Sequence, residues 1–208
     1  MQLTDLFASS LEGLQGQPAV DFDGGDGRVE SLTFGALDLR ARRLAQLFRH
    51  RGLRAGDRVA IYLANRVEFI DVFLACMRLG VVLVPINILY REREIAHIVA
   101  DSEPAAVVTT SPAFPLFSSA IPLWDAGELT ALAATLEPYS TREPIDGDAP
   151  ALLVYTSGTT GRSKGAVLTH NNCLANTANL VTAWCITAQD RYLAVLPLFH
   201  VHGLANGL

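Results

Sequence analysis

Charged residues are scarce in this 208-residue chain, because they make up 18% of it against 50% hydrophobic residues. A composition this apolar excludes an intrinsically disordered chain, since enough nonpolar surface is available to offset the entropy of ordering. An excess of positive charge is also lacking, because the formal net charge is −5 and the isoelectric point is about 5.5. The chain therefore has no general attraction for nucleic acid or for an anionic membrane.

Cysteine is rare and unpaired. The three cysteines, Cys76, Cys173 and Cys185, lie far apart, and no Cys-x-x-Cys pair occurs. An odd number of dispersed cysteines argues against a disulfide framework and against a zinc site, and is typical of thiols in a reducing compartment. We therefore expect no metal ligand among the recognisable motifs.

Signals for a membrane or for export are missing too. The most apolar stretch, Val72 to Leu89, is interrupted by Arg78, Gly80 and Pro85, which makes it a poor membrane-spanning helix. Residues 1–16 lack the basic start of a signal peptide. These features predict a soluble, cytoplasmic protein without a membrane span.

The apolar patterning predicts alternating helices and strands. We expect helices at 4–14, 33–51, 67–79, 91–100 and 126–136, and strands at 19–22, 28–32, 58–63, 81–84 and 105–109. Asp23–Gly27 predicts a hairpin turn between the first two strands, and Thr33 predicts a helix N-cap. From residue 58 on, the alternation indicates βαβ units. The fold class expected is α/β, with three layers and mostly parallel strands flanked by helices.

Four arginines on the predicted helix 33–51 allow two interpretations. Arg40, Arg42, Arg43 and Arg49 form either a basic binding surface or a solvated helix face. The acidic isoelectric point favours the solvated face.

One loop carries recognisable chemistry. It follows a predicted strand at Ala151–Tyr155 and precedes a second at Ala166–Leu168, after which Thr169 opens a helix. The loop contains three glycines, several hydroxyl side chains and Lys164. Glycines allow close backbone approach, backbone N–H groups form a concave anion site, and a lysine supplies a positive charge for a phosphate oxygen. This combination indicates a polyphosphate site.

The loop matches neither common nucleotide-binding pattern. The Walker pattern fails because Lys164 follows Ser163 rather than a glycine, and no G-x-G-x-x-G run is present. By composition alone, a hairpin loop rich in Ser, Thr and Gly with a chance lysine is an equal alternative.

Two ordered motifs resemble a known family. Tyr155–His170, YTSGTTGRSKGAVLTH, resembles the signature loop of the AMP-forming acyl-CoA synthetases, which belong to the adenylate-forming superfamily. The usual proline before the lysine is replaced here by Ser163. Leu196–Gly203, LPLFHVHG, resembles the family's next motif, and its Phe-His-Val-His-Gly run is similar to malonyl-CoA synthetases. Weaker similarity around Asp57–Pro85 extends the resemblance over essentially the whole chain.

The resemblance implies a two-step reaction. A carboxylate attacks the α-phosphate of Mg-ATP to give an acyl-adenylate and pyrophosphate, and coenzyme A then displaces AMP. ATP, Mg²⁺ and coenzyme A are therefore the implied cofactor and substrates, with a small carboxylic acid as partner. The residues implied in phosphate binding are Thr156, Ser157, Gly158, Thr159, Thr160, Gly161 and Lys164. Lys164 and His200 are the implied catalytic residues, with His200 beside the reacting carboxylate.

Family segments beyond these motifs cannot be placed in the chain. In the family, the adenine contacts, the acidic magnesium ligand and a lid lysine follow this region. We therefore expect residues 1–208 to be a partial N-terminal domain that lacks the C-terminal remainder and the lid domain. We also expect the isolated chain to make no acyl-adenylate, and its incomplete sheet to cause self-association.

Other interpretations stay open. A peptide-synthetase adenylation domain or a luciferase-like enzyme shares the signature loop, and an inactive nucleotide-binding or structural fragment is a third possibility. The acid that is activated is not defined by the sequence, because medium-chain, aryl and fatty-acid CoA ligases share much of the Phe-His-Val-His-Gly run. The role of His202 is open. We expect no catalytic task for His50, His97 or His170, which fall on helices or at helix starts.

Overall fold

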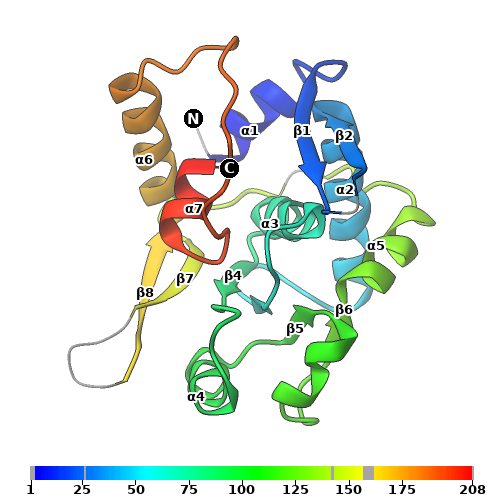
Figure 1. The fold of residues 1–208 in the computed structure, drawn as a ribbon, viewed down its shortest axis with the longest axis vertical. Coiled ribbons are helices and arrows are strands. Elements are labelled where there is room, and N and C mark those ends of the chain that lie inside the picture. The colour runs from blue at the N-terminus through cyan, green and yellow to red at the C-terminus, as the bar shows by residue number, and fades with distance from the viewer. Residues whose placement is uncertain (1–2, 26, 142, 157–161, 208) are drawn as a thin grey trace.

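The computed structural model describes residues 3–25, 27–141, 143–156 and 162–207. The elements in chain order are α1 (Leu3–Leu11), β1 (Pro18–Asp23), β2 (Val29–Thr33), α2 (Phe34–His50), β3 (Arg58–Ile61), α3 (Val67–Leu79), β4 (Val82–Pro85), α4 (Glu92–Ser102), β5 (Ala106–Thr109), the 3₁₀ helix η1 (Ser111–Leu116), β6 (Leu123–Asp125), α5 (Ala126–Ala134), β7 (Pro150–Thr156), β8 (Lys164–Thr169), α6 (His170–Ala183) and α7 (Val201–Gly207). Figure 1 shows their arrangement.

The main sheet is mixed but mostly parallel. Its strand order is β6-β5-β3-β4-β7-β8, and every pairing is parallel except the last, in which β8 returns antiparallel to β7. A separate antiparallel pair, β1 and β2, forms the predicted hairpin. The carboxyl ends of β3, β4 and β7 therefore meet at one edge of the sheet, where open α/β folds bind ligands.

Helices cover both faces of the sheet. Val59 and Ile61 of β3 belong to the same buried cluster as α2 and α3, whereas Ala60 belongs to a second cluster with Ile95 and Ile98 of α4. This alternation follows from the period of two in a strand. In Figure 1, α4 accordingly lies on the opposite side of β4 and β5 from α2 and α3. The expected three-layer α/β fold is confirmed.

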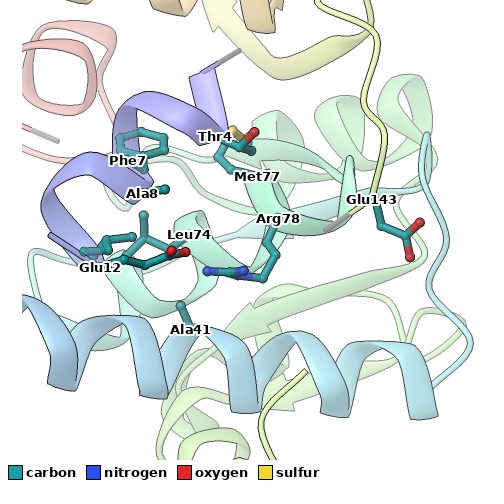
Figure 2. Close-up of a pocket in the computed structure, with 10 residues that line it drawn as sticks. Thr4, Phe7, Ala8, Glu12, Ala41, Leu74, Met77, Arg78 and Glu143 are labelled. Atoms are coloured by element: carbon teal, nitrogen blue, oxygen red, sulfur yellow. The ribbon is translucent and has the colours of Figure 1, made fainter. Parts of the chain in front are cut away.

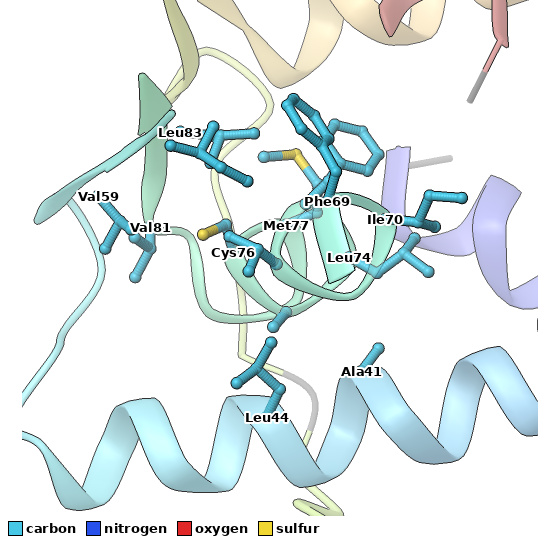
Figure 3. Packing of buried hydrophobic residues seen from close by; sticks show 14 of the residues in the cluster. Ala41, Leu44, Val59, Phe69, Ile70, Leu74, Cys76, Met77, Val81 and Leu83 are labelled. Carbon is cyan, nitrogen blue, oxygen red and sulfur yellow. The ribbon is translucent and has the colours of Figure 1, made fainter. Parts of the chain in front are cut away.

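The core centres on α3, which is buried nearly all round. Figure 3 shows Cys76 and Met77 of α3 among side chains from the strands, including Val59 and Leu83, while Leu44 of α2 approaches from the other side. A helix whose residues are nearly all buried belongs inside a domain rather than on its surface. Residues 67–79 were predicted as a helix, with the same bounds as in the structure.

A polar network crosses the interface between α2 and α3. The Arg40 guanidinium forms a bidentate ion pair with the Asp71 carboxylate, and the shortest N···O distance is 2.6 Å. The Asp71 side chain is 1% exposed. Arg78 of α3 pairs with Asp38 of α2, also at 2.6 Å. The expected solvated arginine face is therefore wrong for Arg40, whose guanidinium is drawn to a buried carboxylate. Arg42 is also only half-exposed and donates to the backbone oxygen of residue 139.

Irregular segments differ most from the prediction. Between the expected strand at 105–109 and the expected helix at 126–136 no element was predicted, and the structure has η1 and the three-residue β6 there. Among the described residues, no helix is long and apolar enough to cross a membrane.

Candidate functional site

The predicted phosphate loop connects β7 to β8. Thr156 ends β7 and pairs with Lys164, which begins β8, so both residues lie at the carboxyl end of β7. Both residues are exposed. Five of the predicted binding residues, Ser157, Gly158, Thr159, Thr160 and Gly161, fall outside the described residues, and their roles stay predictions.

Helix α4 contacts the base of this hairpin. His97 Nε2 lies 2.9 Å from the backbone oxygen of Ser163, and the Tyr155 hydroxyl donates to Asp101 Oδ2 at 2.6 Å. Burial, together with the Asp101 carboxylate, raises the pKa of Tyr155, so its hydroxyl stays protonated and remains a donor. These contacts could not be predicted from local patterns, because they join residues that are 54 and 66 positions apart.

The second motif lies at the same sheet edge. Asn65, which follows β3, accepts from the Leu198 backbone N–H at 2.8 Å and donates to the Leu196 oxygen at 2.9 Å. These two hydrogen bonds between the Asn65 amide and the backbone fix the segment that leads to His200. Asn65 was missed by the sequence reasoning. Its position just after a buried strand was the available signal, since polar residues there face the carboxyl edge.

His200 itself is exposed and close to the end of β4. Its Nε2 lies 3.5 Å from Nδ2 of Asn87, two residues after β4, and its ring centroid is 4.9 Å from that of Phe199. Asn87 is oriented by a bond from the Leu89 N–H to its Oδ1 at 2.9 Å, so its amide NH₂ is the group that faces His200. The structure thus brings His200 to the strand end beside β7. His202 is exposed on α7.

Gly203 is required by close backbone packing. An added Cβ at this position would lie 2.1 Å from the Pro197 oxygen and 2.6 Å from the Pro197 carbonyl carbon. Only a residue without a side chain allows α7 to pack against the turn that carries His200. This gives a physical reason for the glycine that ends the second motif.

Helix α6 starts from a local signal. Thr169 accepts from the Asn172 N–H at 3.1 Å, and Asn172 accepts from the Thr169 N–H at 3.0 Å, which is a reciprocal capping box. His170, the first helical residue, is buried, and its Nε2 has no hydrogen-bond partner among the described residues. Burial lowers the pKa of His170, so its ring stays neutral near neutral pH, in a structural position.

Two cavities that lie between helices of the described part of the chain do not suit a triphosphate. The cavity between α1, α2 and α3, shown in Figure 2, has a volume of about 40 Å³, whereas ligand pockets measure roughly 300–1,000 Å³. The other, of about 300 Å³, lies between α1, α3, α6 and α7 and is lined by no charged side chain.

A metal site is not formed by the described side chains. Within residues 3–25, 27–141, 143–156 and 162–207, no group of three or more His, Cys, Asp or Glu side chains is placed to hold a metal ion. Magnesium that is bound together with a nucleotide takes one or two carboxylates and the phosphates, so this finding concerns a magnesium site formed by protein side chains alone. We derive no step through a magnesium ion.

Comparison with known proteins identifies the family of the chain. A family profile described as "AMP-binding enzyme" matches residues 7–208. The chain belongs to this AMP-binding enzyme family. The fold agrees, because MatB from Rhodopseudomonas palustris superimposes in its apo form with a TM-score of 0.86 and 30% identity, and in an ATP-bound form with 0.84 and 31%. Each comparison covers 98% of this chain and 42% of the MatB chain.

Curated relatives of this AMP-binding chain are carboxylate–CoA ligases by name. It is 38% identical over 185 residues to a sulfoacetate–CoA ligase of Cupriavidus necator, and 35% identical over 178 residues to a feruloyl-CoA synthase of an Amycolatopsis species. Both matches cover 84% of this chain, but only 36% and 35% of the relatives. The chain thus spans little more than a third of their length. The resemblance to AMP-forming acyl-CoA synthetases is confirmed at the level of the family.

Proposed function

We propose that this AMP-binding chain contributes the ATP-phosphate site of an AMP-forming carboxylate–CoA ligase. The observation that carries the proposal is the β7–β8 hairpin, which presents Lys164 at the carboxyl edge of a parallel sheet. The similarity to ATP-bound MatB and to ligases named for sulfoacetate and ferulate supports it.

The chemistry requires charge stabilisation rather than a protein nucleophile. In the proposed first step, a carboxylate oxygen bonds to the α-phosphorus of ATP and the bond to the β-phosphate oxygen breaks, so that pyrophosphate leaves with the electron pair. Coenzyme A thiolate then bonds to the acyl carbon and AMP leaves. Lys164, with Thr156 and the predicted donors at 157–161, would stabilise the negative charge that builds on pyrophosphate.

His200 is proposed to face the reacting carboxylate. Asn87 donates toward its Nε2, which leaves Nδ1 as the N–H donor of a neutral ring. A donor of this kind hydrogen-bonds a carboxylate oxygen and holds it for attack. The identity of the acid is left open by this proposal, since the relatives are named for chemically different acids.

ATP binding provides the direct test. We expect millimolar ATP to raise the melting temperature of the chain, since a ligand specific for the folded state stabilises it. Lys164→Met is expected to weaken ATP binding about tenfold, because a charge-assisted contact to phosphate is lost. Arg54→Met is the matched control. It removes an exposed cation that precedes β3, at the opposite edge of the sheet.

Two results of the ATP-binding experiment would contradict this proposal. If ATP gives no thermal shift in the unaltered chain, the inert structural alternative is favoured. If Lys164→Met and Arg54→Met bind ATP equally well, the phosphate role of Lys164 is wrong. We expect no acid-dependent ATP–pyrophosphate exchange from these 208 residues, because they span about two fifths or less of the compared ligases.

Exposed apolar residues support a proposal of self-association. Leu193 is 81% exposed, Val195 70% and Val167 on the edge strand β8 55%, and Trp184 is 52% exposed. An open strand edge and exposed apolar side chains each favour association between copies. Light scattering is expected to show oligomers, and a Leu193→Lys/Val195→Lys variant to shift them toward monomer. A monomer for the unaltered chain at high concentration would contradict the proposal.

A further inference from the structure

Helix α4 packs with one face on the sheet and turns two polar residues toward the β7–β8 hairpin. Ile95 and Ile98 are 1% and 0% exposed and anchor α4 in the second buried cluster. His97 and Asp101 are four residues apart, so they lie one above the other on a neighbouring face. They contact opposite ends of the hairpin turn, because Asp101 binds Tyr155 and His97 binds Ser163.

The contact from His97 has a defined direction. The Ser163 backbone oxygen accepts only, so Nε2 of His97 has to carry the proton and donate across the 2.9 Å. The protonated ring also donates from Nε2. The bond is therefore kept in either protonation state of His97, and the contact is an anchor rather than a pH switch.

The contact from Asp101 is reinforced by packing. The Tyr155 ring lies edge-on to the His97 ring, with centroids 6.3 Å apart at 81°. On its other side, Gly165 of β8 leaves room for this ring, since a Cβ there would lie 3.2 Å from Tyr155 Cζ and 2.9 Å from Leu153 Cδ1. Tyr155, His97 and the first residues of β8 thus form one packed unit.

We propose that His97 and Asp101 form an α4 latch, in which they act as positioning residues that hold the β7–β8 hairpin, and with it Lys164, at a fixed place against α4. Ser163 directly precedes Lys164, so the bond to its backbone oxygen limits where the Lys164 ammonium can go. The inference rests on the proposed ATP-phosphate function of this hairpin, but the latch itself is a structural statement that is tested without ATP.

Trypsin provides the first test, because Arg162 and Lys164 are exposed cleavage sites on either side of Ser163. His97→Phe keeps an aromatic ring against Tyr155 but removes the donor, whereas His97→Gln keeps an N–H donor. We expect His97→Phe to increase the cleavage rate after Arg162 and Lys164 about fivefold, the effect of one lost hydrogen bond. Cleavage after Arg54 serves as the internal control and is expected to be unchanged.

The cleavage rates of the two variants distinguish a lost hydrogen bond from general destabilisation. Selective acceleration in His97→Phe with restoration in His97→Gln supports the latch. Unchanged cleavage in His97→Phe overturns it, and so does equal acceleration at all three sites, because that result shows general destabilisation. Failure of His97→Gln to restore protection also overturns it, since the donor would then not be the group that matters.

ATP provides the second test and distinguishes the two proposals. If the hairpin binds phosphate, ATP is expected to protect the unaltered chain from cleavage after Arg162 and Lys164. We expect the ATP concentration for half-protection to rise severalfold in His97→Phe and to stay near that of the unaltered chain in His97→Gln. If ATP does not protect the unaltered chain, the proposed phosphate function is contradicted. The latch is then judged by the cleavage rates without ATP. Equal half-protection in all three proteins overturns the positioning role.

Discussion

Replacing Arg40 by methionine is expected to lower the free energy of unfolding by about 3–5 kcal/mol, the typical cost of breaking a buried ion pair. Arg40 contacts both carboxylate oxygens of Asp71, with distances of 2.6 to 3.1 Å. Methionine has a similar reach but no charge, so Asp71 would be left as an unpaired carboxyl in the core. Urea unfolding followed by circular dichroism measures the change.

The matched control is Arg49→Met on the same helix. Arg49 is exposed in the last turn of α2, and removing it is expected to change stability by less than about 0.5 kcal/mol. A loss below about 1 kcal/mol in Arg40→Met would contradict the prediction. The double variant Arg40→Met/Asp71→Leu is expected to recover part of the loss, because no buried charge then remains.

The Arg40→Met deficit is also expected to depend on pH. Burial raises the pKa of Asp71 above its ordinary value even with Arg40 in place, and the loss of the guanidinium raises it further. A carboxyl whose pKa is higher in the folded state favours folding while it is protonated, and this contribution is lost as pH rises through the folded pKa. The stability deficit is therefore expected to narrow between pH 8 and pH 5. A deficit that widens on acidification would show that Asp71 is not the cause.

Gly203→Ala is expected to destabilise the chain by about 1–3 kcal/mol, as inserting an atom into a tightly packed site does. The contact is with the Pro197 backbone, which has no rotamer through which to move away, so α7 or the turn before His200 has to shift. Thermal unfolding measures the stability, and the histidine NMR signals report on whether the surroundings of His200 change.

Gly16→Ala is the matched control for this substitution. No atom lies within 4 Å of a Cβ built at Gly16, and its backbone is not in the left-handed region. We expect that variant to lie within about 0.5 kcal/mol of the unaltered chain. If Gly203→Ala were equally neutral, the backbone contact would not be the reason for this glycine.

Local patterns predicted most of the regular structure. The helix over residues 67–79, the N-cap at Thr33 and the strand–turn–strand around the phosphate loop are each encoded by residues close together in sequence. The family and its fold were recognised from two short motifs for the same reason. The three-residue β6 was missed because so short a strand has no measurable period.

Contacts between distant segments could not be predicted. Arg40 was placed on a solvated face because its partner Asp71 lies 31 residues away on a helix that reads as apolar. His97 was given no catalytic task, and its contact with Ser163 is visible only once α4 is packed under the hairpin. Asn65 is separated from Leu198 by 133 residues. The assignment of residues 157–161 to phosphate stays a prediction.

The antiparallel return of β8 has an electrostatic consequence. In many nucleotide-binding folds the phosphate loop runs straight into a helix, and the partial positive charge at the helix N-terminus attracts the anion. Here β8 first carries the chain back along β7, so that Thr169 pairs with Pro150 and α6 begins at the far end of the hairpin. The dipole of α6 therefore does not act at the Thr156–Lys164 end of the hairpin. Under the proposed function, the ammonium of Lys164 has to neutralise a bound anion without help from this helix.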